Sequence, residues 1–217
     1  MARNNIPAFW QDQNWRYIWV NFGLDRLVQA TVLRYPRTLL KEREVLRHFK
    51  AVDAETGKLM GYIRWQLPYS RYKNQDGSAI WPEGLVPDVT PEAKQAFIKQ
   101  AEEADWEPLD FGADDPFDSN ITRRKNELLG TKDYLVLDYV AVHPDHQGNG
   151  IASALVQHGI KKAKELGLPV FVLAFEAGFR LYEKAGFKVL DTLDQDASKI
   201  GGTEHYIARL MELSIGE

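Results

Sequence analysis

The segment from Gln147 to Ala152 (QGNGIA) places two glycines between an apolar run and an amphipathic segment. Backbone N–H groups at the start of a helix point outward and carry partial positive charge, so they bind phosphate groups. Gly148 and Gly150 lack the side chains that would hold such a ligand away from the main chain. The turn therefore predicts a phosphate or pyrophosphate site, although an ordinary tight turn has the same composition.

Other phosphate motifs are absent from the chain. It contains neither the G-x-x-x-x-G-K-[ST] of a P-loop nor the G-x-G-x-x-G of a dinucleotide-binding turn. It has no cysteine, which excludes disulfides, thiolate catalysis and cysteine-based zinc sites. A net charge of −4 argues against non-specific nucleic-acid binding, which needs a basic surface. We expect no metal site and no nucleic-acid partner.

Asp138 is the one charged residue in the apolar run YLVLDYVAV, residues 134–142. A carboxylate in such a strand has to be paired or has to face a cleft. In a cleft, partial burial would make it a stronger base, suited to accepting a proton from an ammonium substrate. A structural ion pair or hydrogen bond explains the residue equally well, and both readings stay open.

These residues need a regular framework, and the last third of the chain supplies one. Apolar runs predict strands, and apolar residues at helical spacing after Gly150 predict a helix that Gly167 closes. The expected elements, in order, are a strand at Tyr134–Val142, a helix over 152–166, a strand at Val170–Phe175, a helix at Gly178–Ala185, and strands at Phe187–Leu190 and Tyr206–Leu213. This order predicts a mixed α/β layer.

The preceding residues divide into two parts. Aromatic and aliphatic residues in Phe9–Val32 predict one or two helices that end before Pro36, and alternation in Glu44–Val52 and Leu59–Leu67 predicts a hairpin. Residues 68–132 are rich in proline and contain one expected helix, Pro91–Ala104, capped by Thr90. We therefore expect one domain over 1–217, made of N-terminal helices and hairpin (1–67), an insertion (68–132) and a core (133–217).

Two motifs resemble those of one enzyme superfamily. The segment LDYVAVHPDHQGNGIASALVQHGIKKAKELG resembles the acetyl-CoA-binding motif of the GNAT N-acetyltransferases, Q/R-x-x-G-x-G/A after a V-x-P turn, with Gln147, Gly150 and Ala152 at its defining positions. Further on, RLYEKAGF (180–187) resembles the second signature of that family, L-Y-E-K-x-G-F. The segment GYIRWQLP (61–68) is similar to fungal members.

The resemblance implies the GNAT acyl-CoA N-acyltransferase fold, a central splayed mixed β-sheet flanked by helices, here with a long insertion before the central strand. It also implies roles for individual residues. The amides of Gln147, Gly148, Asn149, Gly150, Ile151 and Ala152 would hold the pyrophosphate of acetyl-CoA, and the backbone of Val140, Ala141 and Val142 would pair with its pantetheine arm.

Further roles follow from the same resemblance. Tyr182 would be the acid that protonates the departing thiolate, with Asp138 as candidate base. Glu176 would touch the pantetheine or the substrate, and Lys184, Lys161 or Lys162 would meet the 3′-phosphate. Each has a plainer reading: Tyr182 as a packing residue, Glu176 as a solvated loop residue, and the lysines as a solvated basic face. His143, His146, His158 and His205 are expected to be surface or turn residues.

The implied activity is acetyl transfer from acetyl-CoA to a primary amine, most simply of a small molecule, by direct attack in a ternary complex. The alternatives are a non-catalytic CoA-binding sensor module, a protein N-acetyltransferase, or an interaction domain that uses the insertion. Residues 102–118 hold eight carboxylates and no lysine or arginine: Glu102, Glu103, Asp105, Glu107, Asp110, Asp114, Asp115 and Asp118.

Trp81, Trp106, Phe111 and Phe117 accompany these carboxylates in the sequence. Such a lid would favour a cationic or aromatic amine, although a solvated acidic loop is the plainer reading. The sequence shows no apolar run long enough for a signal peptide or a membrane span, so we expect a cytoplasmic protein without a membrane partner. A homodimer through the aromatic N-terminal segment is one possibility. That segment also lacks the first strand with which GNAT chains usually begin.

Overall fold

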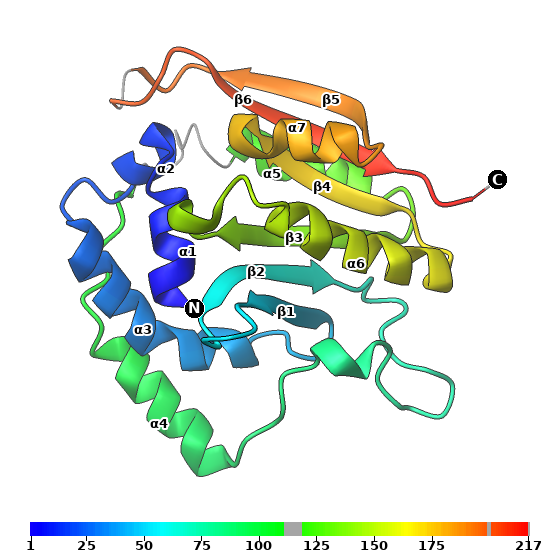
Figure 1. The fold of residues 1–217 in the computed structure, drawn as a ribbon, viewed down its shortest axis with the longest axis horizontal. Coiled ribbons are helices and arrows are strands. Elements are labelled where there is room, and N and C mark those ends of the chain that lie inside the picture. The colour runs from blue at the N-terminus through cyan, green and yellow to red at the C-terminus, as the bar shows by residue number, and fades with distance from the viewer. Residues whose placement is uncertain (111–118, 199–200, 217) are drawn as a thin grey trace.

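The computed structural model describes residues 1–110, 119–198 and 201–216, which form one six-stranded mixed β-sheet flanked by helices (Figure 1). The strand order is β1-β2-β3-β4-β6-β5, and within it β3 and β4 are parallel while the other neighbours are antiparallel. The strands are β1 (Leu46–Val52), β2 (Leu59–Gln66), β3 (Leu135–Val142), β4 (Val170–Phe175), β5 (Lys188–Gln195) and β6 (Tyr206–Leu213). The predicted hairpin is β1–β2, and the predicted mixed α/β order is confirmed.

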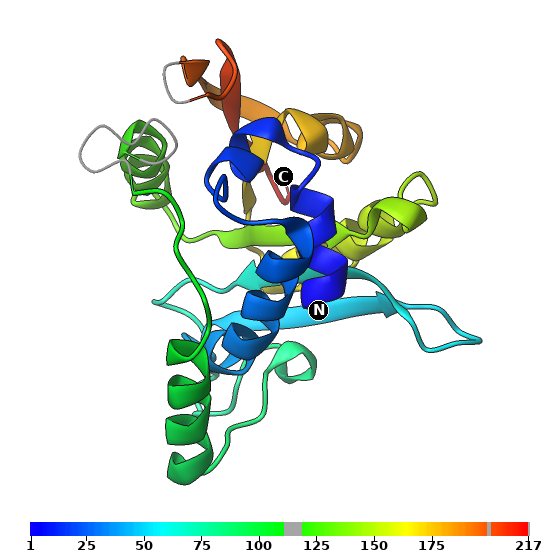
Figure 2. The same ribbon diagram turned by 90° about the vertical axis from the view of Figure 1, so that its left-hand side faces the viewer.

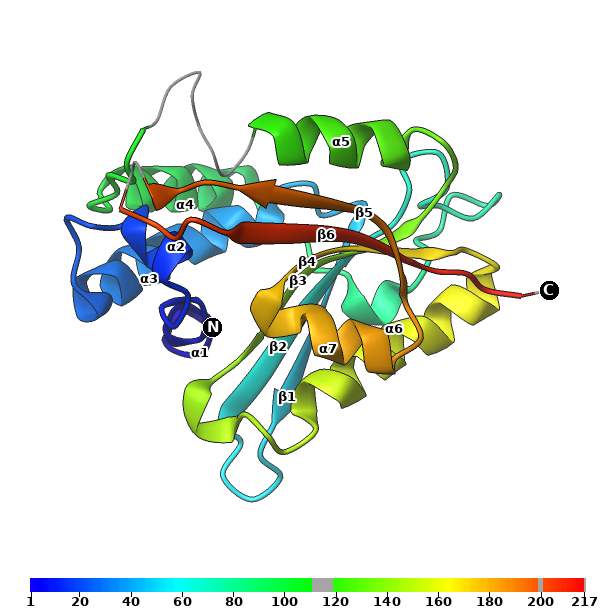
Figure 3. The same ribbon diagram turned by 90° about the horizontal axis from the view of Figure 1, so that it is seen from above.

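Helices cover both faces of the sheet (Figure 3). On one face lie α6 (Ile151–Leu166) and α7 (Glu176–Lys184), and on the other α5 (Ser119–Leu129). Side chains alternate between these faces along each strand. Leu135, Leu137, Val170 and Val172 join the core under α6, whereas Val136 and Phe171 pack with Leu128 and Leu129 of α5.

Helix α6 follows the predicted pattern closely. Its buried face consists of Leu155, Val156, Gly159, Ile160 and Ala163, and Gly167 ends the helix in the left-handed region at φ 64°. At Gly159 the helix backbone lies directly on β2: a Cβ there would stand 2.0 Å from Cζ2 of Trp65. This contact fixes α6, and with it the turn before its first residue, against the centre of the sheet.

Three helices precede the hairpin: α1 (Ala2–Phe9), α2 (Gln13–Tyr17) and α3 (Leu24–Leu40). They stand at the end of the sheet where β3 finishes (Figure 2). The prediction that helix stops before Pro36 is wrong, because α3 continues through that residue. Pro36 lies near the end of α3, so it removes only the hydrogen bond to the carbonyl of Val32, an exposed residue. The expected lack of a first strand holds for this described segment.

The region 68–132 contains more helix than the sequence predicts. α4 (Pro91–Glu102) is found as expected, with the Thr90 side chain accepting a hydrogen bond from the Ala93 amide. A short 3-10 turn (Pro82–Gly84) and α5 were not predicted. Among the described residues, no helix is long and apolar enough to cross a membrane.

Candidate active site

A cavity of about 970 Å³ opens between β3 and β4. The two strands pair only from Leu135–Val170 to Leu137–Val172. β3 then continues to Val142 and β4 to Phe175 without pairing to each other, and residues of both separated segments line the cavity. The splayed sheet that the resemblance implied is therefore present, and the cavity lies in its gap.

The separation of β3 from β4 coincides with an irregularity on the other side of β3. The β2–β3 register shifts between Arg64 and Trp65, which pair with Tyr139 and Leu137, so Asp138 is the extra residue of a β-bulge. The guanidinium of Arg64 binds the Asp138 carboxylate with Nε and Oδ2 2.5 Å apart, and it also lies 5.5 Å from the centroid of the Tyr139 ring. The consecutive residues Asp138 and Tyr139 of β3 therefore both contact the guanidinium of Arg64, which the bulge makes possible.

Asp138 satisfies both expectations for a charge in this strand. It is paired, and it also lines the cavity. Its side chain is 29% exposed and that of Arg64 is 23% exposed, so the pair sits at the cavity wall rather than in the core. The pair fixes the orientation of the carboxylate, which is compatible with a structural role and with a role as base.

The turn after β3 has the geometry of an anion site. Gly148 and Gly150 have φ of 77° and 76°, and a Cβ on either would meet no atom within 4 Å. α6 begins directly after Gly150 without a side-chain cap. The side-chain amide of Asn149 stabilises the turn by donating hydrogen bonds to the carbonyl oxygens of His146 and Gln147, each at 3.2 Å. The first N–H groups of α6 therefore face open space, as the pyrophosphate prediction requires.

The first helix is tied to this same region. The side-chain amide of Gln147 donates to the carbonyl of Val142 and to Oε1 of Gln11, both at 3.2 Å. The Asn4 amide donates to the carbonyl of Ala141 at 3.3 Å. α1 and the chain after it thus lie along the splayed end of β3, and two of its carbonyl groups already have side-chain partners.

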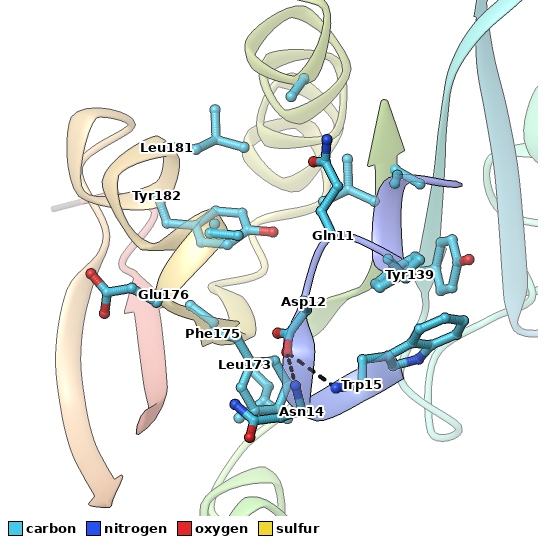
Figure 4. A pocket seen from close by; sticks show the side chains of 18 of the residues that line it. Gln11, Asp12, Asn14, Trp15, Tyr139, Leu173, Phe175, Glu176, Leu181 and Tyr182 are labelled. Carbon is cyan, nitrogen blue, oxygen red and sulfur yellow. Dashed lines mark hydrogen bonds between the residues drawn. The ribbon is translucent and has the colours of Figure 1, made fainter. Parts of the chain in front are cut away.

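Tyr182 lies on α7 and lines the cavity from the α6 side of the sheet. The residue is only 4% exposed, and its hydroxyl points into the cavity (Figure 4). Burial raises the pKa of Tyr182 above its usual value, so the phenol keeps its proton at neutral pH. The structure thus places a protonated O–H donor in the gap between β3 and β4.

The other two predicted residues of α7 lie differently. Glu176 borders the cavity, but its carboxylate pairs with Arg209 of β6 at 2.8 Å and points away from the interior (Figure 4). Lys184 is exposed at the end of α7 and is absent from the described lining of the cavity. Lys162 pairs with Glu165 at 2.6 Å, as expected of a solvated face.

Several cavity residues have no counterpart in the sequence analysis. Asp12 and Trp15 come from α2, Lys125 from α5, and Phe175 and Tyr206 from the strand ends. The motif Asp12-Gln-Asn-Trp could have indicated a helix cap, and Asp12 does accept bonds from the amides of Asn14 and Trp15. For Lys125 no such signal exists, because it stands within TRRKNE, a stretch of six consecutive polar residues.

The described part of the acidic segment, residues 102–110, does not line the cavity. Trp106 packs against Trp19 with ring centroids 4.6 Å apart, and Asp105 pairs with Arg26, so 102–110 rests on the N-terminal helices. Trp81 is not a lid residue as expected; it is 4% exposed in the main core. Phe111, Asp114, Asp115, Phe117 and Asp118 lie outside the described residues.

The histidines are mostly as expected. His158 packs on Phe49, and His143 and His146 belong to the turn after β3. His205 also borders the cavity, where its Nδ1 lies 2.8 Å from Oδ2 of Asp194. In the part of the chain that the structure describes, no group of three acidic or histidine side chains is arranged to hold a metal ion.

Comparisons with known proteins agree with this arrangement. The family model "Acetyltransferase (GNAT) family" matches residues 101–187. An uncharacterized N-acetyltransferase of Schizosaccharomyces pombe is 29% identical over 76 residues, and the L-amino acid N-acyltransferase MnaT of Escherichia coli is 36% identical over 66 residues. These matches cover 34% and 29% of this chain, and the chain spans only 32% and 38% of the two relatives.

A solved structure extends the likeness to the whole fold. The crystal structure described as arylalkylamine N-acetyltransferase 7 of the yellow fever mosquito superposes with a TM-score of 0.57 at 14% identity, over 98% of this chain and 81% of that one. The sequence matches cover the turn and α6, and the superposition covers the splayed sheet. By its sequence the segment 101–187 is that of the GNAT acetyltransferase family, and the chain as a whole shares the fold of the mosquito protein.

Proposed function

We propose that this protein transfers the acetyl group of acetyl-CoA to the primary amine of a small molecule, with both substrates bound together. The proposal rests on the gap between β3 and β4. The turn at 147–152, with its free backbone amides, lies at one end of this gap, and the hydroxyl of Tyr182 points into it. The family match supports the reaction class, and the choice of a small amine as acceptor rests on the cavity and on the names of distant relatives.

The residues present fit acetyl-CoA as cosubstrate. Gly148 and Gly150 leave open space where side chains would stand, and the first amides of α6 are available for a pyrophosphate. The segment of β3 from Val140 to Val142 has no strand partner on the β4 side, where its backbone groups not bound by Asn4 or Gln147 can pair with an extended pantetheine arm as an added strand. Glu176 and Lys184 have weaker support as cofactor contacts, because the first binds Arg209 and the second lies outside the described cavity lining.

Acetyl-CoA supplies a thioester whose acyl carbon accepts an amine nitrogen and whose sulfur leaves as a thiolate. In the proposed reaction the C–N bond forms as the C–S bond breaks. Asp138 takes the proton that the nitrogen loses, and the Tyr182 hydroxyl donates a hydrogen bond to the leaving sulfur. The ion pair with Arg64 fixes the Asp138 carboxylate at the cavity wall.

The role of Tyr182 follows from its burial. A thiol has a pKa of about 8.5, below that of any phenol, and burial raises the pKa of Tyr182 further. Complete proton transfer from this phenol to the thiolate is therefore uphill. Tyr182 keeps its proton and acts as a hydrogen-bond donor that stabilises the negative charge growing on sulfur, and coenzyme A leaves as the thiolate, which takes a proton from water.

A small acceptor fits the cavity better than a polypeptide. α1, α2 and α5 border the acceptor side, and the volume of about 970 Å³ suits a pantetheine arm plus one small molecule. The names of distant relatives point to small amines as well, namely L-amino acids and arylalkylamines. A cytoplasmic location and a homodimer are further parts of the proposal.

The test combines binding with turnover. Calorimetry with CoA and acetyl-CoA comes first, followed by thiol release from acetyl-CoA with amines, amino acids and lysine-containing peptides. We expect binding and release with at least one small amine. Tyr182→Phe should lower kcat about 10- to 100-fold and leave the Kd of acetyl-CoA unchanged. Tyr69→Phe, at an exposed tyrosine outside the cavity, is the matched control.

Each alternative gives a different result. Binding of acetyl-CoA without thiol release for any acceptor would indicate a sensor module, and release with peptides alone would indicate a protein N-acetyltransferase. If the folded protein binds neither CoA nor acetyl-CoA, the proposed function is wrong. If Tyr182→Phe turns over normally, transfer does not use this hydroxyl.

A further inference from the structure

Within the part of the chain that the structure describes, not all of the charges around the cavity are compensated. Asp138 is paired with Arg64, Glu176 with Arg209, and the imidazole of His205 with Asp194. Lys125 is different: it lines the cavity, and among the described residues no carboxylate lies within ion-pairing distance of it. An ammonium group that is partly withdrawn from water without a partner favours binding of an anion.

The position of Lys125 separates it from the cofactor turn. α5 packs through Leu128 and Leu129 on the face of the sheet opposite α6. The turn at 147–152 belongs to the α6 face, so the anion that Lys125 meets is not the pyrophosphate bound there. Lys125 therefore belongs to the acceptor side of the gap.

Aromatic rings form the wall on that side. Phe175 at the end of β4 stacks on Tyr206 of β6, with centroids 4.8 Å apart and ring planes 14° from parallel, and Trp15 of α2 lines the same cavity. Burial raises the pKa of Tyr206, and the nearby carboxylate of Asp12 adds to the rise, so Asp12 faces this wall. Within the described chain Asp12 has hydrogen bonds to backbone amides but no cationic partner.

We propose that the acceptor is an aromatic amine that also carries a carboxylate, of the aromatic amino-acid type. The carboxylate binds Lys125, the ring packs against Phe175, Tyr206 and Trp15, and the amine lies towards Asp12 and the gap. This inference rests on the proposed function. The sequence led us to expect a cationic or aromatic amine as acceptor, and this inference restricts the acceptor to an amine that also has an acidic group. The reason is that Lys125, which has no ionic partner among the described residues, would repel a purely cationic ligand.

The test uses matched acceptors that differ only in the acidic group. L-Phenylalanine, L-phenylalaninamide and phenethylamine share the ring and the amine, and the last two lack the carboxylate. Thiol release is measured with the full-length protein, its Lys125→Ala and Lys125→Arg variants, and Lys99→Ala as a control at an exposed lysine of α4. Thermal melting confirms that each variant is folded, and calorimetry confirms that it binds acetyl-CoA.

The expected result is a preference of at least 10-fold in kcat/KM for L-phenylalanine over both other acceptors. Lys125→Ala should remove it by raising KM for L-phenylalanine about 10- to 100-fold, with a far smaller change for the amide. Lys125→Arg and Lys99→Ala should retain the preference.

Equal use of the three acceptors, or an equal loss for all of them in Lys125→Ala, would overturn the inference. So would acetyl-CoA binding without turnover of L-phenylalanine. Failure to bind acetyl-CoA would instead count against the proposed function.

Discussion

Gly178 lies directly beneath the ring of Tyr182, so that a Cβ on Gly178 would stand 2.9 Å from Cε2 of the tyrosine. The two residues are one helical turn apart on α7, and the missing side chain lets the phenol lie flat against the helix. The hydroxyl therefore reaches the gap because position 178 carries no side chain. Gly178 is a positioning residue for Tyr182.

Gly178→Ala should push the Tyr182 ring outward and lower kcat about 10- to 100-fold, since misplacement of a reacting group by about 1 Å has effects of that size. The Kd of acetyl-CoA should change little, because the amide turn is untouched. Steady-state thiol release and calorimetry measure the two quantities. Glu183→Ala, at an exposed position next to Tyr182, is the control; a wild-type kcat in Gly178→Ala would show that the ring is not held by this contact.

Gly150 should matter for cofactor affinity rather than for stability alone. Its φ of 76° disfavours other residues, and its missing Cβ leaves room at the turn. Gly150→Ala should raise the Kd of acetyl-CoA at least about 10-fold, because a methyl group keeps the phosphates from the amides. Gly77, with φ of 81° and open surroundings, carries the same backbone strain far from the cavity.

Gly77→Ala should therefore lower the melting temperature about as much as Gly150→Ala and leave the Kd of acetyl-CoA at its wild-type value. Calorimetry on both variants separates affinity from stability. Equal affinities for the two variants would mean that the turn does not hold the cofactor.

Asp138→Asn distinguishes the two readings of that residue. If Asp138 is the base, the variant keeps the shape of the bulge but lowers kcat about 10²- to 10⁴-fold at neutral pH. If it only anchors Arg64, the loss appears in stability, and turnover of the folded protein remains near wild type. Thiol release and denaturant unfolding are measured together. Arg64→Gln is the companion variant, because it removes the same ion pair while leaving the carboxylate.

Local signals were enough for the C-terminal part of the fold. β4 and β6 have the predicted bounds, because each is a short apolar run closed by turn residues. β5 extends to Gln195, beyond the predicted Leu190, because four of its last five residues are polar, as an edge strand allows, and the apolar pattern misses them. α5 was missed since Ile121, Leu128 and Leu129, which pack on the sheet, stand among charged residues.

The candidate site likewise contains residues that the sequence identifies and residues that it does not. The amide turn and Tyr182 belong to contiguous motifs, so the sequence identifies them and the structure adds their geometry. Asp12, Lys125 and Tyr206 come together only through tertiary packing of three distant segments, and no periodicity or motif joins them. The gap begins where the β2–β3 register has its bulge at Asp138, a feature of register that a single strand cannot reveal.

His48 should make stability depend on pH in a defined window. Its Nδ1 lies 2.6 Å from the hydroxyl oxygen of Tyr62, and its buried Nε2 has no partner in the described residues. Burial lowers the pKa of His48 to about 4, with Arg64 and Arg47 adding to the effect. Above pH 6.5 neither the folded nor the unfolded state carries the His48 proton, so titration of His48 takes nothing from the free energy of unfolding there.

Between pH 6.5 and about 4 only the unfolded state binds that proton, and the free energy of unfolding falls as the pH falls. Allowing for partial exposure of the ring, we expect a loss of about 1–3 kcal/mol across this window. Denaturant unfolding of wild type and His48→Gln at pH 7 and pH 4.5 measures it. Carboxylates titrate in both proteins and cancel in the difference, so the variant should lose less stability than wild type.

His205 provides a control of opposite sign. Its pKa is raised by Asp194, so its contribution is present below pH 6.5 and is lost as the pH rises through the folded pKa. His205→Gln should therefore remove a small stabilisation at low pH and make the decline towards pH 4.5 steeper than in wild type. Parallel pH dependence in His48→Gln and wild type would mean that His48 is protonated in the folded protein as readily as in the unfolded chain.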